Sequence, residues 1–426
     1  MKYFFKRKQM IAVAMLALIS FLNCDRDSSP WIWKVEGDKI TVNQLDSAYE
    51  HFLYMMSQKI RMNVDELKTY IENPRSAPNQ LQQYLPGLTK KSYVEQYKRM
   101  VLLNLQARDD GYLEQKNIKD LLDFLTKYYI VDNYVREKIN PEDFQVTEEE
   151  VVAQWERIRS ENPQYKQVPI EQGLKVVKEK MIMQLMAGAQ KEFLDNITGS
   201  YIIEANTDYP TVTYASEPED APGHRDKWLW KIDGQKVTAG QADDGYHSYL
   251  HMMAQQLQTE PDKLEGYVQN PETAPSEIKQ FVNQFTKESF LKQYKELLLT
   301  NIEAEKQGFT DKKEVKDQIK FIHNFYTANL YMMQLVDPAQ IEVTDEEALA
   351  KFERLRKENP SFRSVPLSEG LPIMKRQVMM EKLTIRSADV MRKILESYRI
   401  EVNPDFDLKK YTAPQQAPAP APTEPK

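Results

Sequence analysis

The stretch WIWKVEGDKIT at residues 31–41 returns as WLWKIDGQKVT at residues 228–238. In both copies apolar and polar residues alternate on either side of an acidic residue followed by glycine, a pattern that predicts a β-hairpin. Trp33 matches Trp230, which sets an offset of 197 positions between the copies. The sequence therefore predicts a structural unit that opens with a hairpin and is present twice.

The same offset holds without a gap from residues 31–210 to residues 228–407. Matched groups include Asn73-Pro74 with Asn270-Pro271 and Glu161-Asn162-Pro163 with Glu358-Asn359-Pro360. A repeat of about 180 residues has the size of a domain and is far longer than the units of solenoid proteins. We expect two modules, at 31–207 and 227–408, each closed on itself by pairing its last strand with its own hairpin.

The chain begins with the features of a secretory signal. Four basic residues precede an apolar run from Met10 to Leu22, which is too short to span a membrane comfortably. Cys24, the only cysteine, follows at once. We expect residues 1–23 to be a lipoprotein signal, Cys24 to be lipidated and 24–30 to form a tether, although Asn23 departs from the usual lipobox and resembles the relaxed boxes of spirochaetes. A conventionally cleaved signal is the alternative.

The mature chain is acidic. Removal of residues 1–23 takes four positive charges from a net charge of −7 and leaves −11. Nucleic-acid affinity comes mainly from Lys and Arg, so we expect no nucleic-acid partner. No second apolar stretch approaches membrane-spanning length, and membrane attachment is therefore expected through the lipid on Cys24.

Two segments are rich in Pro and other residues that disfavour a packed core. The stretch 208–226 contains three prolines and is predicted to be an unstructured linker. The stretch 409–426 alternates Pro with Ala and is predicted to be an extended tail.

Most of each repeat shows helical spacing of apolar residues. Thr147 with Glu150, and Thr344 with Glu347, form Thr-x-x-Glu motifs that predict capping boxes at helix starts. Long final helices are followed by the short strands Tyr201-Ile202-Ile203-Glu204 and Tyr398-Arg399-Ile400-Glu401. The predicted fold class is mainly α, with a short hairpin and a returning strand in each module.

In order and spacing these motifs resemble the N-terminal chaperone domain of the SurA/PrsA/PpiD group of periplasmic folding factors. The opening strand of that group matches Ile232-Asp233-Gly234-Gln235-Lys236-Val237-Thr238, its Glu-Ala-x-x-x-Gly motif matches Glu303 to Gly308, and its Val-Thr-acidic motif matches Val343 to Glu347. In that group a parvulin-type prolyl isomerase usually follows the next helix. Here only Pro163–Pro169 and Pro360–Pro366 stand at that place, so the resemblance implies client binding without isomerase activity.

The residues give no support for catalysis. None of the five histidines has a histidine at the matching position of the other repeat, and His247 and His251 lack the context of a zinc site. We found no nucleophile elbow and no phosphate-binding loop. We therefore expect no catalytic residues, no metal and no cofactor.

Methionine is the feature that favours binding. Flexible, polarizable Met side chains suit promiscuous apolar partners, and adjacent Met residues on a helix cannot both face one narrow stripe. The proposed client-binding residues are Met55, Met56, Met252, Met253, Met332 and Met333. We expect a lipid-anchored holdase, on the outer membrane and facing the periplasm, for unfolded or outer-membrane polypeptides. A surface-exposed lipoprotein that binds host or envelope ligands is the alternative.

Overall fold

The computed structural model of the chain describes residues 28–60, 62–140, 143–257 and 259–413. These residues fall into two compact units. Unit 1 contains residues 1–109 and 327–426, and unit 2 contains residues 110–326. Each unit therefore combines a part of the first repeat with a part of the second. The predicted module boundaries, 31–207 and 227–408, do not coincide with the compact units.

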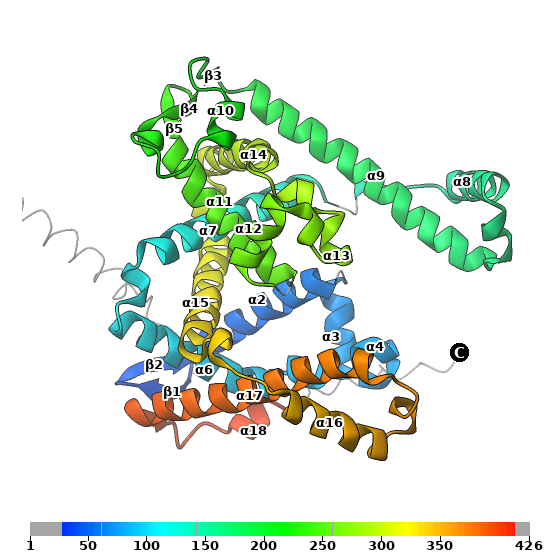
Figure 1. Cartoon of the computed structure of the whole chain (residues 1–426). Coiled ribbons are helices and arrows are strands. Elements are labelled where there is room, and N and C mark those ends of the chain that lie inside the picture. Colours follow the sequence, from blue (N-terminus) through cyan, green and yellow to red (C-terminus); the bar gives the residue numbers. More distant parts are fainter. Residues whose placement is uncertain (1–27, 61, 141–142, 258, 414–426) are drawn as a thin grey trace, which may run out of the picture. The chain divides into compact units, whose positions relative to one another are not determined.

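Unit 1 is mainly helical (Figure 1). Its elements are β1 (Trp31–Val35), β2 (Asp38–Thr41), α2 (Val42–Ile60), α3 (Val64–Glu72), η1 (Pro74–Ser76), α4 (Asn79–Gln82), α5 (Leu85–Leu88), α6 (Lys90–Asp109), η9 (Pro338–Gln340), α16 (Asp345–Glu358), η10 (Pro360–Phe362), α17 (Leu367–Ser397), β6 (Ile400–Val402) and α18 (Leu408–Tyr411).

Unit 2 is mainly helical as well, which confirms the predicted fold class. Its elements are η2 (Tyr112–Glu114), α7 (Lys116–Lys138), α8 (Glu148–Glu161), η4 (Pro163–Gln167), α9 (Ile170–Gly199), β3 (Ile203–Ala205), α10 (Thr211–Ser216), η5 (His224–Asp226), β4 (Trp228–Ile232), β5 (Gln235–Thr238), α11 (Ala239–Gln256), α12 (Pro261–Gln269), η6 (Pro271–Thr273), α13 (Ser276–Lys279), η7 (Val282–Phe285), α14 (Lys287–Lys306), η8 (Phe309–Asp311) and the start of α15 (Lys313–Val336), which continues into unit 1.

The two predicted hairpins form. Glu36 and Gly37 have φ of 52° and 92°, and Asp233 and Gly234 have φ of 47° and 82°. Positive φ at both central residues is the requirement of a type I′ turn, whose twist matches that of the flanking strands. The acidic-Gly pair in each repeat is therefore explained by turn geometry.

The returning strands do not pair as expected. β3, from the end of the first repeat, pairs with β4 of the second repeat, at Ile203 opposite Ile232. β6, from the end of the second repeat, pairs with β1 of the first, at Val35 opposite Ile400. The sheet orders are β2-β1-β6 and β3-β4-β5. The prediction that each module closes on itself is wrong, because the repeats exchange their last strands.

The same side-chain contact secures both exchanged strands. The Asn403 side-chain amide donates to the Trp31 carbonyl at 2.7 Å, and that of Asn206 donates to the Trp228 carbonyl at 2.7 Å. Each amide thus joins one repeat to the other. The exchange is therefore built into both copies.

The prediction of an unstructured linker at 208–226 is also wrong. Tyr214 in α10 is fully buried, and its hydroxyl donates to Asp243 at 2.9 Å. Tyr411 in α18 makes the equivalent contact with Asp46 at 2.5 Å. The repeat therefore extends through these helices, and α18 occupies the start of the tail predicted at 409–426. Residues 414–426, like residues 1–27 with Cys24, lie outside the described residues.

Helices of both repeats build the core of unit 2. α7 packs on α11 and α14, and α9 packs on α14. Phe290 lies at the centre of this core, fully buried and stacked on Tyr294 with ring centroids 5.1 Å apart. Burial of such aromatic side chains is a main source of stability. Much of the core of unit 2 therefore depends on residues from both repeats.

Candidate functional site

A helical hairpin extends from unit 2, formed by α8, η4 and the first half of α9 (Figure 1). The Thr147 hydroxyl accepts a hydrogen bond from the Glu150 amide, and the Glu150 carboxylate accepts one from the Thr147 amide at 2.9 Å. The predicted capping box is confirmed. The hydrogen bonds from Thr147 also lower the pKa of Glu150. We call this hairpin the first arm.

A close contact between its two helices holds the first arm together. Trp155 of α8 is buried with Val151 and Val177. A Cβ atom at Gly173 of α9 would lie 2.2 Å from the Trp155 ring, far inside van der Waals contact. Glycine within a helix costs about 1 kcal/mol relative to alanine, so its presence here is explained by the space that the ring needs.

The second arm, formed by α16, η10 and the first half of α17, repeats this design in unit 1. Phe352 takes the place of Trp155, and a Cβ atom at Gly370 would lie 2.2 Å from its ring. Phe352 is fully buried with Met374. The Arg356 guanidinium lies over the Phe352 ring and donates to the Arg363 carbonyl at 3.0 Å, which closes the hairpin.

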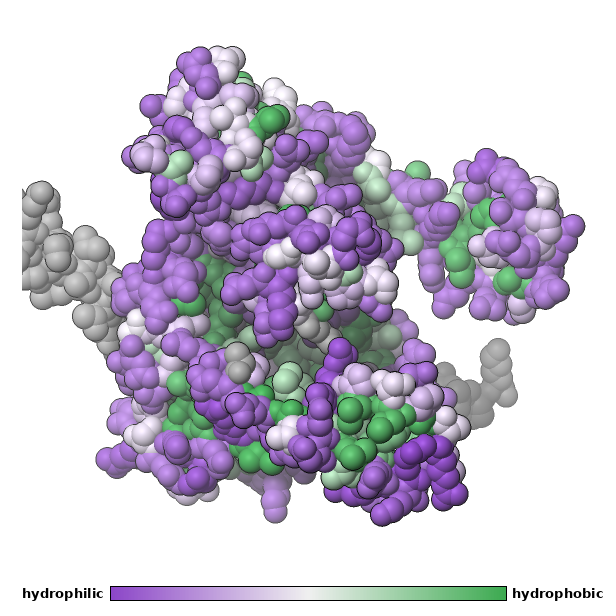
Figure 2. Space-filling model, in the orientation of Figure 1, coloured by the Kyte–Doolittle hydropathy of each residue, from purple (hydrophilic) through white to green (hydrophobic). Residues whose placement is uncertain are grey.

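Both arms expose large apolar side chains at matching positions. Val176 and Met183 of α9 are 58% and 62% exposed, and their counterparts Ile373 and Met380 of α17 are both 56% exposed. Seven residues make almost two helical turns, so each pair lies on one face of its helix. Figure 2 shows hydrophobic surface among polar residues at the α8–α9 tip and over α16 and α17. Two further exposed pairs share this pattern: Val152 with Leu349 and Ile170 with Leu367.

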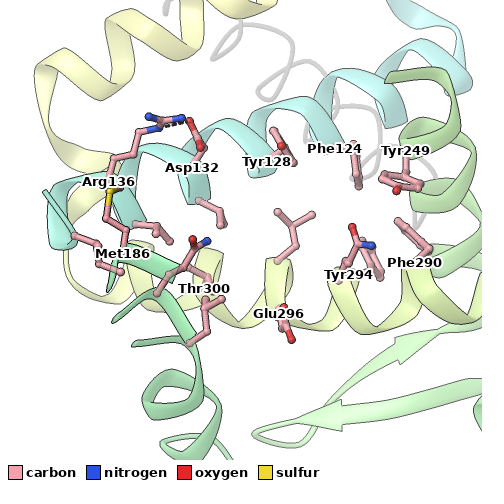
Figure 3. Close-up of a pocket in the computed structure, with 17 residues that line it drawn as sticks. Phe124, Tyr128, Asp132, Arg136, Met186, Tyr249, Phe290, Tyr294, Glu296 and Thr300 are labelled. Atoms are coloured by element: carbon pink, nitrogen blue, oxygen red, sulfur yellow. Dashed lines mark hydrogen bonds and ion pairs between the residues drawn. The ribbon is translucent and has the colours of Figure 1, made fainter. Parts of the chain in front are cut away.

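A groove of about 400 Å³ lies within unit 2, between α7, α9, α11 and α14 (Figure 3). Its floor is buried and apolar, and includes Phe124, Val135, Phe290 and Leu297. In Figure 3, Phe124, Tyr249, Phe290 and Tyr294 gather at one end, and Arg136, Met186 and Thr300 lie toward the other. Burial raises the pKa of Tyr249 above its ordinary value of 10.0.

The six methionines predicted to bind clients differ widely in exposure. Met252 is buried, with 5% of its surface exposed, while Met333 is 48% exposed. Met55, Met56, Met253 and Met332 are half-buried. None of the six lines the groove of unit 2. A role of these side chains in client binding stays a prediction, and Met252 is available only if the helix moves.

Sequence reasoning missed a buried polar cluster in unit 2. His224 is fully buried, and its Nδ1 and Nε2 atoms lie 2.9 Å from carboxylate oxygens of Glu217 and Asp243. Lys287 bonds Asp243 at 3.2 Å, as Lys90 bonds Asp46 at 2.6 Å in unit 1. The sequence contained a signal for this cluster, because Tyr214, Asp243 and Lys287 match Tyr411, Asp46 and Lys90 at the repeat offset.

His247 forms a pair with Glu219 at 2.8 Å. This contact raises the pKa of His247 and lowers that of Glu219 to about 2. The Glu219 contribution to stability is present above its ordinary pKa of 4.5 and is lost as the pH falls toward 2. The His247 contribution is present below its ordinary pKa of 6.5 and is lost as the pH rises through its raised value.

We expect the pair to stabilise unit 2 most between about pH 4.5 and 6.5. Because both side chains are partly exposed, the effect should be below about 1 kcal/mol. In His247→Gln the urea midpoint should therefore change less between pH 5.5 and pH 8 than it does in the wild type. An unchanged pH dependence in the variant would show that other groups cause it.

Within the described ranges there is no helix that could span a membrane and no cluster of residues that could hold a metal ion. Comparison of the whole chain with protein-family models, curated proteins and solved structures found no match.

Proposed function

We propose that the protein is a holdase that binds unfolded polypeptides on the exposed apolar faces of its two arms, without nucleotide and without prolyl isomerase activity. One observation carries this proposal: Val176 and Met183, and their counterparts Ile373 and Met380, are exposed in both repeats. Apolar side chains on the solvent-exposed face of a helix do not stabilise it. Covering them with an apolar partner would remove apolar surface from water and would favour binding.

The chemistry of the arms suits clients of varied sequence. The exposed faces carry aliphatic side chains and methionine, which adapt to differently shaped apolar partners. Two weak sites on one chain raise the effective concentration of the second site once the first is occupied. Binding of this kind needs no chemical step, which agrees with the absence of catalytic motifs from the sequence.

The resemblance to SurA/PrsA/PpiD chaperone domains supports the same function. The proposal includes export, lipidation at Cys24 and attachment to a bacterial membrane, with unfolded or outer-membrane polypeptides as clients. Met333 is exposed and is retained as a further contact. The short segments Pro163–Pro169 and Pro360–Pro366 are the reason for proposing no isomerase.

We expect Val176→Gln with Met183→Gln to weaken suppression of client aggregation, because both changes remove apolar contact area without touching a buried residue. Light scattering of an unfolded outer-membrane protein, diluted into the chaperone, measures the effect. The double variant should need about five-fold more protein for the same suppression, and adding Ile373→Gln with Met380→Gln should abolish it.

Ile202→Gln with Val212→Gln is the matched control, since both residues are at least as exposed and lie in unit 2 outside the arm. This control should behave as the wild type. Equal loss in both double variants would mean that general surface hydrophobicity is responsible. If the wild type does not suppress aggregation at all, a surface lipoprotein that binds host or envelope ligands becomes the better proposal.

A further inference from the structure

We propose that the groove of unit 2 binds a single-chain amphiphile with an uncharged polar head, such as a monoacylglycerol. This inference does not depend on the holdase proposal, because the groove shares none of the exposed arm residues just described. Its volume of about 400 Å³ is in the range of small-molecule sites. Its shape, its floor and one unsatisfied polar group define the ligand.

The groove is long enough for one extended alkyl chain. On α7 its lining runs from Phe124 to Arg136, which is about 18 Å of helix, and on α14 from Phe290 to Thr300, which is about 15 Å. A zigzag of 1.5 Å bonds advances about 1.3 Å per carbon, so a chain of about 12 carbons matches this length.

The floor favours an alkyl chain over a peptide. It is made of helices, whose backbone groups are already bonded to one another, and its buried side chains are almost all apolar. A peptide laid across it would leave its own N–H and C=O groups without partners, at a cost of about 1–3 kcal/mol each. An alkyl chain brings no such groups.

The Thr300 hydroxyl marks the place where the polar head of the ligand would bind. Its side chain lines the groove and is 1% exposed, and its Oγ1 atom has no hydrogen-bond partner in the structure. At the matching position the first repeat has the apolar Leu103, so packing does not require a hydroxyl here. A buried hydroxyl without a partner is unfavourable unless a ligand satisfies it. One such atom, away from the aromatic end, fits a ligand with one polar head.

The charges at the rim favour an uncharged head. Arg136 is paired with Asp132 at 2.9 Å, and Glu296 adds a negative charge. The three residues together carry a net charge of −1. A carboxylate head would therefore meet no net attraction, whereas hydroxyl and ester groups can bond to Thr300 without a charge penalty.

Titration of the full chain with monoacylglycerols of 8, 10, 12 and 16 carbons, followed by calorimetry below their micelle-forming concentrations, tests the proposal. Each added pair of carbons should tighten binding about ten-fold up to about 12 carbons. Affinity should then level off because the groove is full. A continued rise to 16 carbons would indicate partition onto general apolar surface and would overturn the proposal, as would the absence of saturable binding.

Two variants and one matched control locate the site. Val131→Trp, from the groove wall, should fill the groove and abolish binding, while Val212→Trp on α10, exposed and outside the groove, should leave binding unchanged. Thr300→Val should weaken binding of the 12-carbon monoacylglycerol about ten-fold without loss of helicity, because only the hydroxyl is removed. Binding that survives Val131→Trp would contradict this location.

Laurate, with the same chain and a carboxylate head, separates the contribution of the head from that of the chain. It should bind more weakly than the 12-carbon monoacylglycerol at pH 8, and equal or tighter binding would overturn the choice of an uncharged head. An unfolded polypeptide should not displace the monoacylglycerol. If it does, the groove is a client site and the amphiphile proposal fails. If instead the arm variants leave suppression of aggregation unchanged, only the holdase proposal fails.

Discussion

A chain cut between its two repeats should remain one particle. We expect a protease site inserted between Asp220 and Ala221, an exposed point between α10 and η5, to yield two fragments that stay together in size-exclusion chromatography. The reason is the strand exchange, because β3 pairs with β4 and β6 pairs with β1 across the cut. The packing of α7 on α11 and α14 adds a buried apolar interface.

Concentrated urea should separate the fragments, which provides the control that cleavage was complete. Removal of the urea from the mixture should restore the helical circular dichroism of the uncut chain. Elution of the cut protein as two folded monomers would show that each repeat closes on itself after all. That outcome would contradict the sheet orders β2-β1-β6 and β3-β4-β5.

The exchange of strands also predicts how the isolated repeats behave. Residues 31–207 alone contain β1 without β6, β3 without β4, and α7 without α11 and α14. We therefore do not expect this fragment, or residues 227–408, to be a stable monomer. Local patterns predicted the hairpins and, two residues too early, the returning strands β3 and β6. They did not predict the partners of these strands, because both repeats present nearly the same strand and hairpin to each other.

Local rules were sufficient where a feature depends on neighbouring residues. The acidic-Gly turns at Glu36 and Asp233 and the capping boxes at Thr147 and Thr344 have the predicted geometry. The prediction of an unstructured linker at 208–226 failed because the prolines there suggested disorder. The burial of Tyr214 depends instead on Asp243, which lies 29 residues away. Comparison of Tyr214 with Tyr411 at the repeat offset would have shown that the segment belongs to the repeat.

The candidate site was harder to predict. Methionine content indicated an adaptable apolar surface, but residue type alone does not give exposure, and Met252 is buried while Met183 is exposed. The groove could not be foreseen at all, since its walls come from both repeats. One usable signal was the glycine shared by α9 and α17, at Gly173 and Gly370, in the interior of helices where alanine is favoured.

The variant Gly173→Ala should unfold the first arm and leave the rest of unit 2 intact. The added Cβ would lie 2.2 Å from the Trp155 ring. Such overpacking costs about 1–3 kcal/mol, against a gain of about 1 kcal/mol in helix propensity. The arm has only a small core around Trp155, Val151 and Val177. A net loss of stability there should therefore be enough to unfold the arm locally.

Gly188→Ala is the matched control, since it makes the same substitution in the same helix with no atom within 4 Å of the new Cβ. It should be neutral or stabilising. Hydrogen exchange should show lost protection in 148–180 for Gly173→Ala and unchanged protection in α7 and α14. Combined with Gly370→Ala, the variant should also lose suppression of client aggregation, because both exposed faces depend on folded arms. Retained protection of the arm would show that Trp155 can move aside and that the tight ring contact does not hold the arm. Lost protection with unchanged suppression of aggregation would place the client surface elsewhere on the chain.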